Sequence, residues 1–187
     1  MPATDAPIFP PPAPRARPLS HRLVLPLLLL LIAGGVASPF VVNALKHRQL
    51  AANETATLEL IKAYVQAQER RRAEAGPAGE YARRFDQLAL PAPFPDIDEP
   101  NAAPLHGYRF RILTTTNDGE WLDARGRMTG GFGLLAVPAD YMVSGRDTFL
   151  AAGSSIYCVD MGIPTPQATR ELRSFGLPPK ARKISGE

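Results

Sequence analysis

The chain has 187 residues, a formal net charge of +3 and a pI near 9.2, a size that suits one folded domain with terminal extensions. Its basicity sits at the two ends. Residues 1–22 have three arginines and one aspartate, residues 162–187 have five basic and two acidic side chains, and residues 43–161 have 13 basic and 15 acidic ones. Proteins that bind nucleic acids concentrate positive charge on the folded surface, so this distribution excludes nucleic acid as an expected partner.

Residues 1–22 form the first predicted segment. Seven of the first eighteen residues are prolines, and such a segment neither keeps a helix nor buries a face, so a disordered, basic, proline-rich tail is predicted.

Residues 23–42 contain no charged side chain, and a helix of that length spans about 30 Å, the thickness of the hydrocarbon core of a bilayer. A transmembrane helix that contacts the lipid bilayer is therefore predicted. The arginines before it outnumber Lys46 and Arg48 after it by one, which favours the short tail inside and the domain outside. The alternative is a signal peptide cleaved before Ser38, with Gly35 and Ala37 at positions −3 and −1.

Helix-forming residues continue from residue 43 to Gly76-Pro77, which stops the helix. Leu58, Ile61 and Val65 recur at helical spacing and give this stretch one apolar stripe. A short helix is predicted over 81–90, and the prolines of residues 91–105 indicate a loop.

From His106 the periodicity changes to that of strands. In residues 108–112 three apolar side chains alternate with Arg109 and Arg111, which predicts a strand with one buried face. Further strands are predicted over 132–137, 147–151 and 156–160, with turns at 117–119 and 152–155. Short connections favour an antiparallel meander, so the predicted fold class is α+β: a long N-terminal helix packed on a small antiparallel sheet. Residues 43–161 form this domain, and residues 162–187 a basic, proline-containing tail.

The order of these elements resembles that of type IV pilins and of type II secretion pseudopilins. The segment LIAGGVASPFVVNALKHRQLAANETATLELIKAYVQAQERRR is similar to the pilin N-terminal helix, whose apolar half runs into an amphipathic half. Glu80-Tyr81-Ala82, HGYRFRI at 106–112 and AVPADYMVSGRDTFLAAGSSIY at 136–157 are similar to sheet motifs of small bacterial pilin-like domains. HGYRFRILT and GRMTGGFG also resemble an uncharacterised bacterial domain family. The resemblance covers residues 31–161.

This resemblance implies a single-pass protein of the bacterial inner membrane with a periplasmic or extracytoplasmic domain. Its implied partners are other pilin-like or secretion-assembly proteins. The chain departs from the pilin pattern because it has neither the Gly-Phe cleavage point nor an acidic residue within 23–42. A shared fold without filament assembly is therefore expected.

The candidate chemical motifs each have a structural explanation. The glycines of GRMTGGFG (126–133) lack the lysine of a phosphate loop, so a bulged or tightly turned strand is expected. Cys158 and His106 could form a thiol–imidazole pair, but Cys158 lies in a predicted strand, where a small buried side chain is expected. Asp96, Asp98 and Glu99 could hold Ca²⁺, but they lack the calcium-loop spacing, so a solvated turn is expected. No catalytic, cofactor or metal residue is predicted.

The strand that carries Arg109 and Arg111, with the neighbouring edge of the sheet, is the first candidate for a binding surface. The predicted function is that of a non-enzymatic, membrane-anchored interaction protein of a secretion or pilus-related envelope assembly, with no evident small-molecule substrate. The alternative is a signal-peptide-cleaved periplasmic domain that binds a small ligand or acts as a hydrolase.

Overall fold

The fold is described from a computed structural model. It describes residues 21–76, 79–99, 101–117, 119–163, 165–166, 168, 172 and 176–184, with only the backbone for residues 21–38. The chain divides into two compact units, Met1–Asn43 and Ala44–Glu187. The predicted tail up to residue 20 lies outside the described residues, as do most side chains of the predicted transmembrane segment at 23–42.

One helix, α1 (His21–Glu74), precedes all the strands. It ends where predicted, since Gly76 has a φ of +69° that favours glycine. Arg71 and Arg72 lie in its last turn, where the exposed carbonyl groups favour positive charge. Within the range whose side chains are placed, no helix has the length and apolar character needed to cross a membrane.

The main sheet has five strands in the order β1-β4-β5-β6-β7, and every pairing is antiparallel. The strands are β1 (Tyr108–Leu113), β4 (Gly133–Pro138), β5 (Asp147–Ala152), β6 (Ser155–Asp160) and β7 (Arg182–Ile184). A separate pair, β2 (Thr115–Thr116) and β3 (Gly119–Glu120), flanks the predicted turn at 117–119. The α+β class and the antiparallel meander are therefore confirmed.

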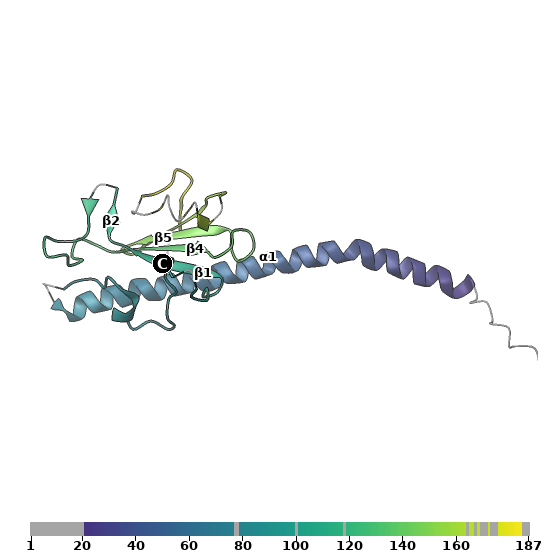
Figure 1. The fold of residues 1–187 in the computed structure, drawn as a ribbon, viewed down its shortest axis with the longest axis horizontal. Helices are drawn as coiled ribbons and strands as arrows, with labels where there is room; N and C mark the ends of the chain where they lie inside the picture. Colours follow the sequence, from purple (N-terminus) through teal and green to yellow (C-terminus); the bar gives the residue numbers. More distant parts are fainter. Residues whose placement is uncertain are drawn as a thin grey trace, which may run out of the picture. The chain divides into compact units, whose positions relative to one another are not determined.

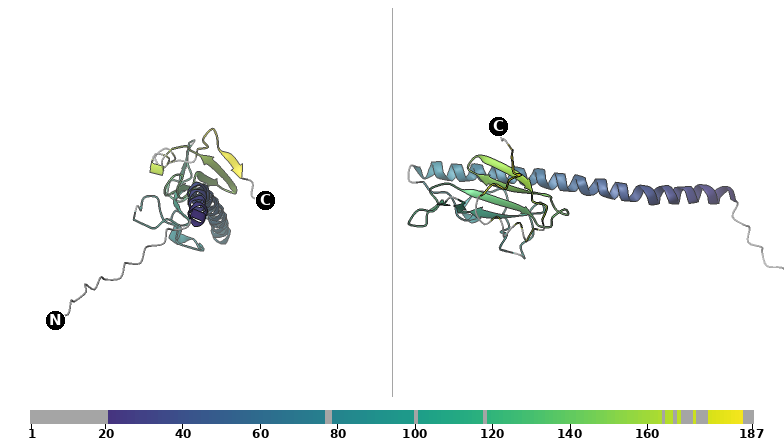
Figure 2. Two further views of the ribbon diagram at one scale, coloured as in Figure 1. Left: turned by 90° about the vertical axis from the view of Figure 1, so that its right-hand side faces the viewer. Right: turned by 90° about the horizontal axis from the view of Figure 1, so that it is seen from above.

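The alternation of side chains divides the core into two layers. On one face Phe110, Ala136, Phe149 and Cys158 lie opposite one another across four strands, and they pack in the same cluster as Ile61 and other residues of α1. The other face carries a second cluster, in which Leu135, Val137 and Leu150 are joined by Leu172 and Ala181 from the C-terminal part. β4 and nearly all of β5 are buried on both faces, and accordingly β4 is a continuous apolar run and β5 is apolar from Phe149 onward. Figures 1 and 2 show the sheet against one side of the later part of α1.

A buried polar network joins α1 to the segment that follows it. The Gln68 amide donates to the carbonyl of Ala82 (2.9 Å) and accepts from its backbone N–H (2.7 Å). The same amide nitrogen donates to the Tyr64 hydroxyl (2.8 Å), which donates to the carbonyl of Gly133 (3.2 Å). Both side chains are fully buried, so these bonds are made away from water. Removing one partner would leave a buried polar group without a hydrogen bond and would destabilise the fold.

The prediction of a helix over 81–90 is wrong. Only a 3₁₀ turn, η2 (Phe85–Gln87), forms there, and Tyr81 instead makes a bridge with Met128. The physical reason is the network just described, because Gln68 takes both backbone groups of Ala82 that a helix would use. The segment 162–187, assigned to a tail from its composition, contains β7, whose Arg182–Ile184 pair with Ile156–Cys158 of β6.

The glycines of residues 126–133 make room for an indole ring. A Cβ atom on Gly131 would lie 2.8 Å from Nε1 of Trp121, and one on Gly133 would lie 2.7 Å from its Cζ3. Gly126 has a φ of +72° in a turn closed by its own N–H and the carbonyl of Asp123. The turn at Gly126 agrees with the tight turn expected from the sequence, whereas the packing of Gly131 and Gly133 against Trp121 was not expected.

Candidate functional site

Strand β1 presents one apolar and one basic face, as predicted. Tyr108 and Phe110 are fully buried toward α1, and the half-buried Arg109 and Arg111 point to the opposite face. Arg111 Nη2 pairs with Asp98 Oδ1 at 2.7 Å, and Arg109 Nη1 donates to the carbonyl of Glu99 at 2.6 Å. The arginines therefore hold the 96–99 loop against the strand.

The outer edge of β1 is only partly covered. The N–H of Phe110 donates to the carbonyl of Pro95 (2.9 Å), and its carbonyl accepts from the N–H of Ile97 (2.8 Å). Tyr108 exchanges two backbone hydrogen bonds with Leu105. Along a strand, successive residues direct their N–H and C=O groups alternately toward the two edges. Tyr108 and Phe110 direct theirs away from β4, so Ile112 is the next residue to do so. Within the described part of the chain, no backbone group bonds to Ile112 from this side.

A cleft of about 520 Å³ opens beside this edge. Phe85, Phe94 and Ile112 give it an apolar lining, and the Phe85 and Phe94 rings lie 5.2 Å apart between centroids. The remaining lining is charged, with three arginines and four carboxylates, namely Arg83, Arg84, Arg111, Asp86, Asp96, Asp98 and Glu99.

Ion pairs neutralise part of this charge. Arg84 pairs with Asp86 at 2.6 Å, just as Arg111 pairs with Asp98. Arg83 Nη1 donates to the carbonyl of Gly126 (2.7 Å) and not to a carboxylate. Across the described residues, neither Asp96 nor Glu99 forms a side-chain ion pair, so the lining keeps a small excess of negative charge.

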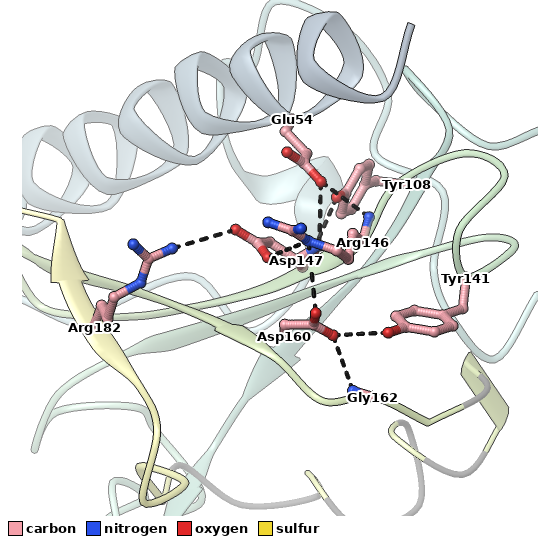
Figure 3. Close-up of polar contacts among 8 residues, drawn as sticks. All are labelled: Glu54, Tyr108, Tyr141, Arg146, Asp147, Asp160, Gly162 and Arg182. Carbon is pink, nitrogen blue, oxygen red and sulfur yellow. Dashed lines mark hydrogen bonds and ion pairs between the residues drawn. The ribbon is translucent and has the colours of Figure 1, made fainter. Parts of the chain in front are cut away.

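A second polar cluster joins α1 to the start of β5, as Figure 3 shows. Glu54 Oε1 accepts from the backbone N–H groups of Arg146 (2.9 Å) and Asp147 (3.2 Å). The Tyr108 hydroxyl donates to the carbonyl of Asp147 at 2.8 Å. Beyond these bonds, Arg146 lies 3.6 Å from carboxylate oxygens of both Asp147 and Asp160, and Arg182 lies 3.9 Å from Asp147. The cluster thus fixes the β4–β5 loop against the helix.

Three ionisable groups of this cluster, Tyr108, Tyr141 and Arg146, have a raised pKa. Burial, and then the Glu54 and Asp147 carboxylates, raise the pKa of Tyr108 far above its usual range. The hydrogen bond from Tyr141 to Asp160 raises the pKa of Tyr141, and the adjacent Asp147 raises that of Arg146. Acid–base catalysis needs a group that titrates near the working pH, and the shifts of these three groups move away from it. The arrangement fits a structural role.

The loop that this cluster fixes has an apolar tip. Met142 is 51% exposed and Val143 70% exposed. Met142 has a φ of +63°, which is uncommon for a residue other than glycine, and its N–H donates to the carbonyl of Gly145 at 2.8 Å. Asn53 of α1 ties the same loop to the helix by donating to the carbonyl of Ser144 at 2.7 Å.

The residues singled out for chemistry do not converge. Cys158 lies buried in β6, as predicted, and burial raises the pKa of its thiol. His106 lies beside β1, which is separated from β6 by β4 and β5. Asp98 pairs with Arg111, while Asp96 Oδ1 accepts the N–H of Asp98 (2.9 Å). Among the described residues, no group of three or more His, Cys, Asp or Glu side chains is placed to hold a metal ion.

Sequence reasoning missed the contacts that organise these surfaces. Glu54 and Asp147 are 93 residues apart, and no local pattern links a helix carboxylate to the amides at a strand start. Trp121 left one detectable signal, because three glycines at 130, 131 and 133 near a lone tryptophan are typical of close packing against a large ring.

A family model described as "Protein of unknown function (DUF2950)" matches residues 87–183, just over half of the chain. The match begins after α1 and ends within β7, so it takes in the β1 edge and most of the Figure 3 cluster but not Glu54. Neither the curated proteins nor the solved structures gave a match.

Proposed function

The chain belongs to a family of proteins of unknown function (DUF2950), and we propose that it is a membrane-anchored, non-enzymatic interaction protein with a pilin-like domain. In this proposal residues 23–42 anchor it in the bacterial inner membrane. The domain lies on the periplasmic side and contacts proteins of a secretion or pilus-related assembly.

The exposure of α1 is the observation that carries the proposal. Residues 39–49 are all exposed, among them Phe40 (74%) and Leu45 (58%). From Leu50 onward, by contrast, the helix buries a regular stripe against the sheet. The large apolar side chains of this stretch lie at its start, at residues 40–42 and at Leu45. Such exposed side chains are unfavourable in water and are typical of a surface that contacts lipid or another protein.

The order of elements supports the pilin-like part of the proposal. A long N-terminal helix lies against a short antiparallel meander, as in the class that the sequence resembles. The absence of the Gly-Phe cleavage point and of an acidic residue in 23–42 argues for a non-filament component of such an assembly.

The buried state of the candidate nucleophile supports the non-enzymatic part. Cys158 has a raised pKa and lies in the core, so little reactive thiolate forms near neutral pH. The cleft beside β1 favours the alternative of a small-ligand-binding or hydrolytic domain, and it is the place where that alternative would be tested.

Photo-cross-linking in native membranes tests the proposal. A photoreactive phenylalanine analogue replaces Leu45 in one variant and the exposed Glu69 of the same helix in a control. We expect adducts with lipid or protein from position 45 and far fewer from position 69. Equal adducts from both positions, or none from position 45, would contradict the proposal.

A further inference from the structure

We propose that the cleft beside β1 binds an extended peptide segment of a partner protein, which carries a basic side chain and adds to the sheet edge at Ile112. The inference rests on the proposed function as an interaction protein and names the class of partner that this site takes.

The backbone of the β1 edge provides the first argument. Residues 95–97 already run alongside β1 as a short parallel segment, bonded to both backbone groups of Phe110. The chain then turns away, since the N–H of Glu99 bonds to the carbonyl of Asp96 (3.2 Å). The edge at Ile112 is therefore left without a partner strand among the described residues. An N–H and C=O pair without a backbone partner at a sheet edge is the attachment point in strand addition.

The lining of the cleft provides the second argument. Phe94 lies 4.4 Å from Phe110 between ring centroids, so the apolar wall is continuous with the core under β1. A segment paired with Ile112 would send alternate side chains toward Phe85 and Phe94 and toward the charged rim. The cleft volume of about 520 Å³ lies within the usual range of binding pockets, roughly 300–1,000 Å³.

The charge of the rim selects the segment. Arg84 and Arg111 are neutralised by Asp86 and Asp98, as described above. Of the remaining lining charges, Arg83 is outnumbered by Asp96 and Glu99. A lysine or arginine in the bound segment would compensate that excess, whereas an acidic side chain would be repelled.

Peptide binding to the detergent-solubilised full chain tests the inference. The probes are fluorescent hexapeptides of alternating valine and threonine with one central lysine, and matched peptides with one central glutamate. We expect the lysine peptides to bind more tightly. Ile112→Pro removes the outward N–H without touching the bonds to β4, and should weaken binding about 3- to 10-fold, the worth of one hydrogen bond. Ile112→Val keeps the N–H and should bind like the original chain.

A second variant covers the case in which Ile112→Pro unfolds the domain. Glu99 is exposed, so Glu99→Lys should leave the fold intact and reverse the preference toward the glutamate peptides. The inference is overturned if no peptide binds, if lysine and glutamate peptides bind equally, or if a folded Ile112→Pro binds like the original chain.

These outcomes are separable from those of the proposed function. If peptide binding fails while position 45 still forms adducts in the membrane, only the cleft assignment is lost. If position 45 forms no adducts, the proposed function is lost whatever the peptides do.

Discussion

Two stretches of α1 differ sharply in how they are covered. Residues 39–49 are exposed along their whole length, whereas Leu60, Ile61, Tyr64, Ala67 and Gln68 are buried against the sheet. The buried stretch combines apolar packing with a satisfied polar network, so its contacts lie within the chain. The exposed stretch carries large apolar side chains with no such cover. The difference shows that the sheet covers only the later stretch of the helix, and the proposed function assigns the exposed stretch to lipid or partner contacts.

Of the changes considered, truncating Tyr64 in the buried stretch should lower the free energy of unfolding most. Tyr64→Ala removes a fully buried ring that contacts Phe85, Phe94 and Phe132, and should lower the free energy of unfolding by about 3–5 kcal/mol. Leu45→Ala, the matched change in the exposed stretch, should alter it by less than about 0.5 kcal/mol. Urea unfolding of the detergent-solubilised chain measures both. Equal losses would show that the two stretches do not differ as described.

Gln68→Leu tests the polar part of the same stretch. It leaves the N–H and carbonyl of Ala82 buried without their partner, which should cost about 2–3 kcal/mol. The control is Glu69→Ala, which changes the next residue of the helix. Because Glu69 is exposed, this change should leave the free energy of unfolding nearly unchanged. If Gln68→Leu unfolds at the same urea concentration as the control, the network does not hold α1 to the following segment.

Glu54→Ala tests the contact between α1 and the β4–β5 loop. The backbone N–H groups of Arg146 and Asp147 lose their acceptor, so a loss of about 1–2 kcal/mol is expected. Their amide hydrogens should also exchange faster with solvent. Glu54→Gln keeps an acceptor oxygen and should recover most of the stability. Unchanged exchange in Glu54→Ala would show that the carboxylate does not fix the loop.

The smallest expected effect is chemical and concerns Cys158 on the buried side of the sheet. Its pKa is raised by burial, so at a given pH less thiolate is present than in a free thiol. We expect a disulfide reagent to react at least about tenfold more slowly with the native chain than with the urea-unfolded chain. Equal rates at pH 8 would show that the helix-facing side of β6 is open to solvent.

Local patterns predicted most of the fold. The alternation in residues 108–112 and the apolar runs of β4 to β6 placed four strands to within about a residue at each end, because side-chain period and burial are local signals. Two elements were misread because their structure depends on contacts between distant residues, which local patterns do not record. Residues 81–90 have helical composition but are held by Gln68, and β7 is a three-residue exposed edge strand whose pairing with β6 leaves no pattern.

The candidate site was only half predictable. The sequence pointed to the strand of Arg109 and Arg111, because the alternation of apolar and basic residues distinguishes a buried face from a more exposed one. It did not reveal that residues 95–97 cover Phe110 and stop short of Ile112, nor that Glu54 reaches the amides of the β5 start. Such contacts depend on where distant segments meet, which a single sequence does not record.

The intact mass of the protein from its native membrane fraction, taken after carbonate extraction, would decide whether residues 23–42 are a retained membrane anchor. We expect a chain of full length, about 20.2 kDa, that stays in the membrane pellet. A chain beginning at Ser38 and recovered in the soluble fraction would contradict this expectation, because the exposed stretch of α1 would then have no bilayer beside it.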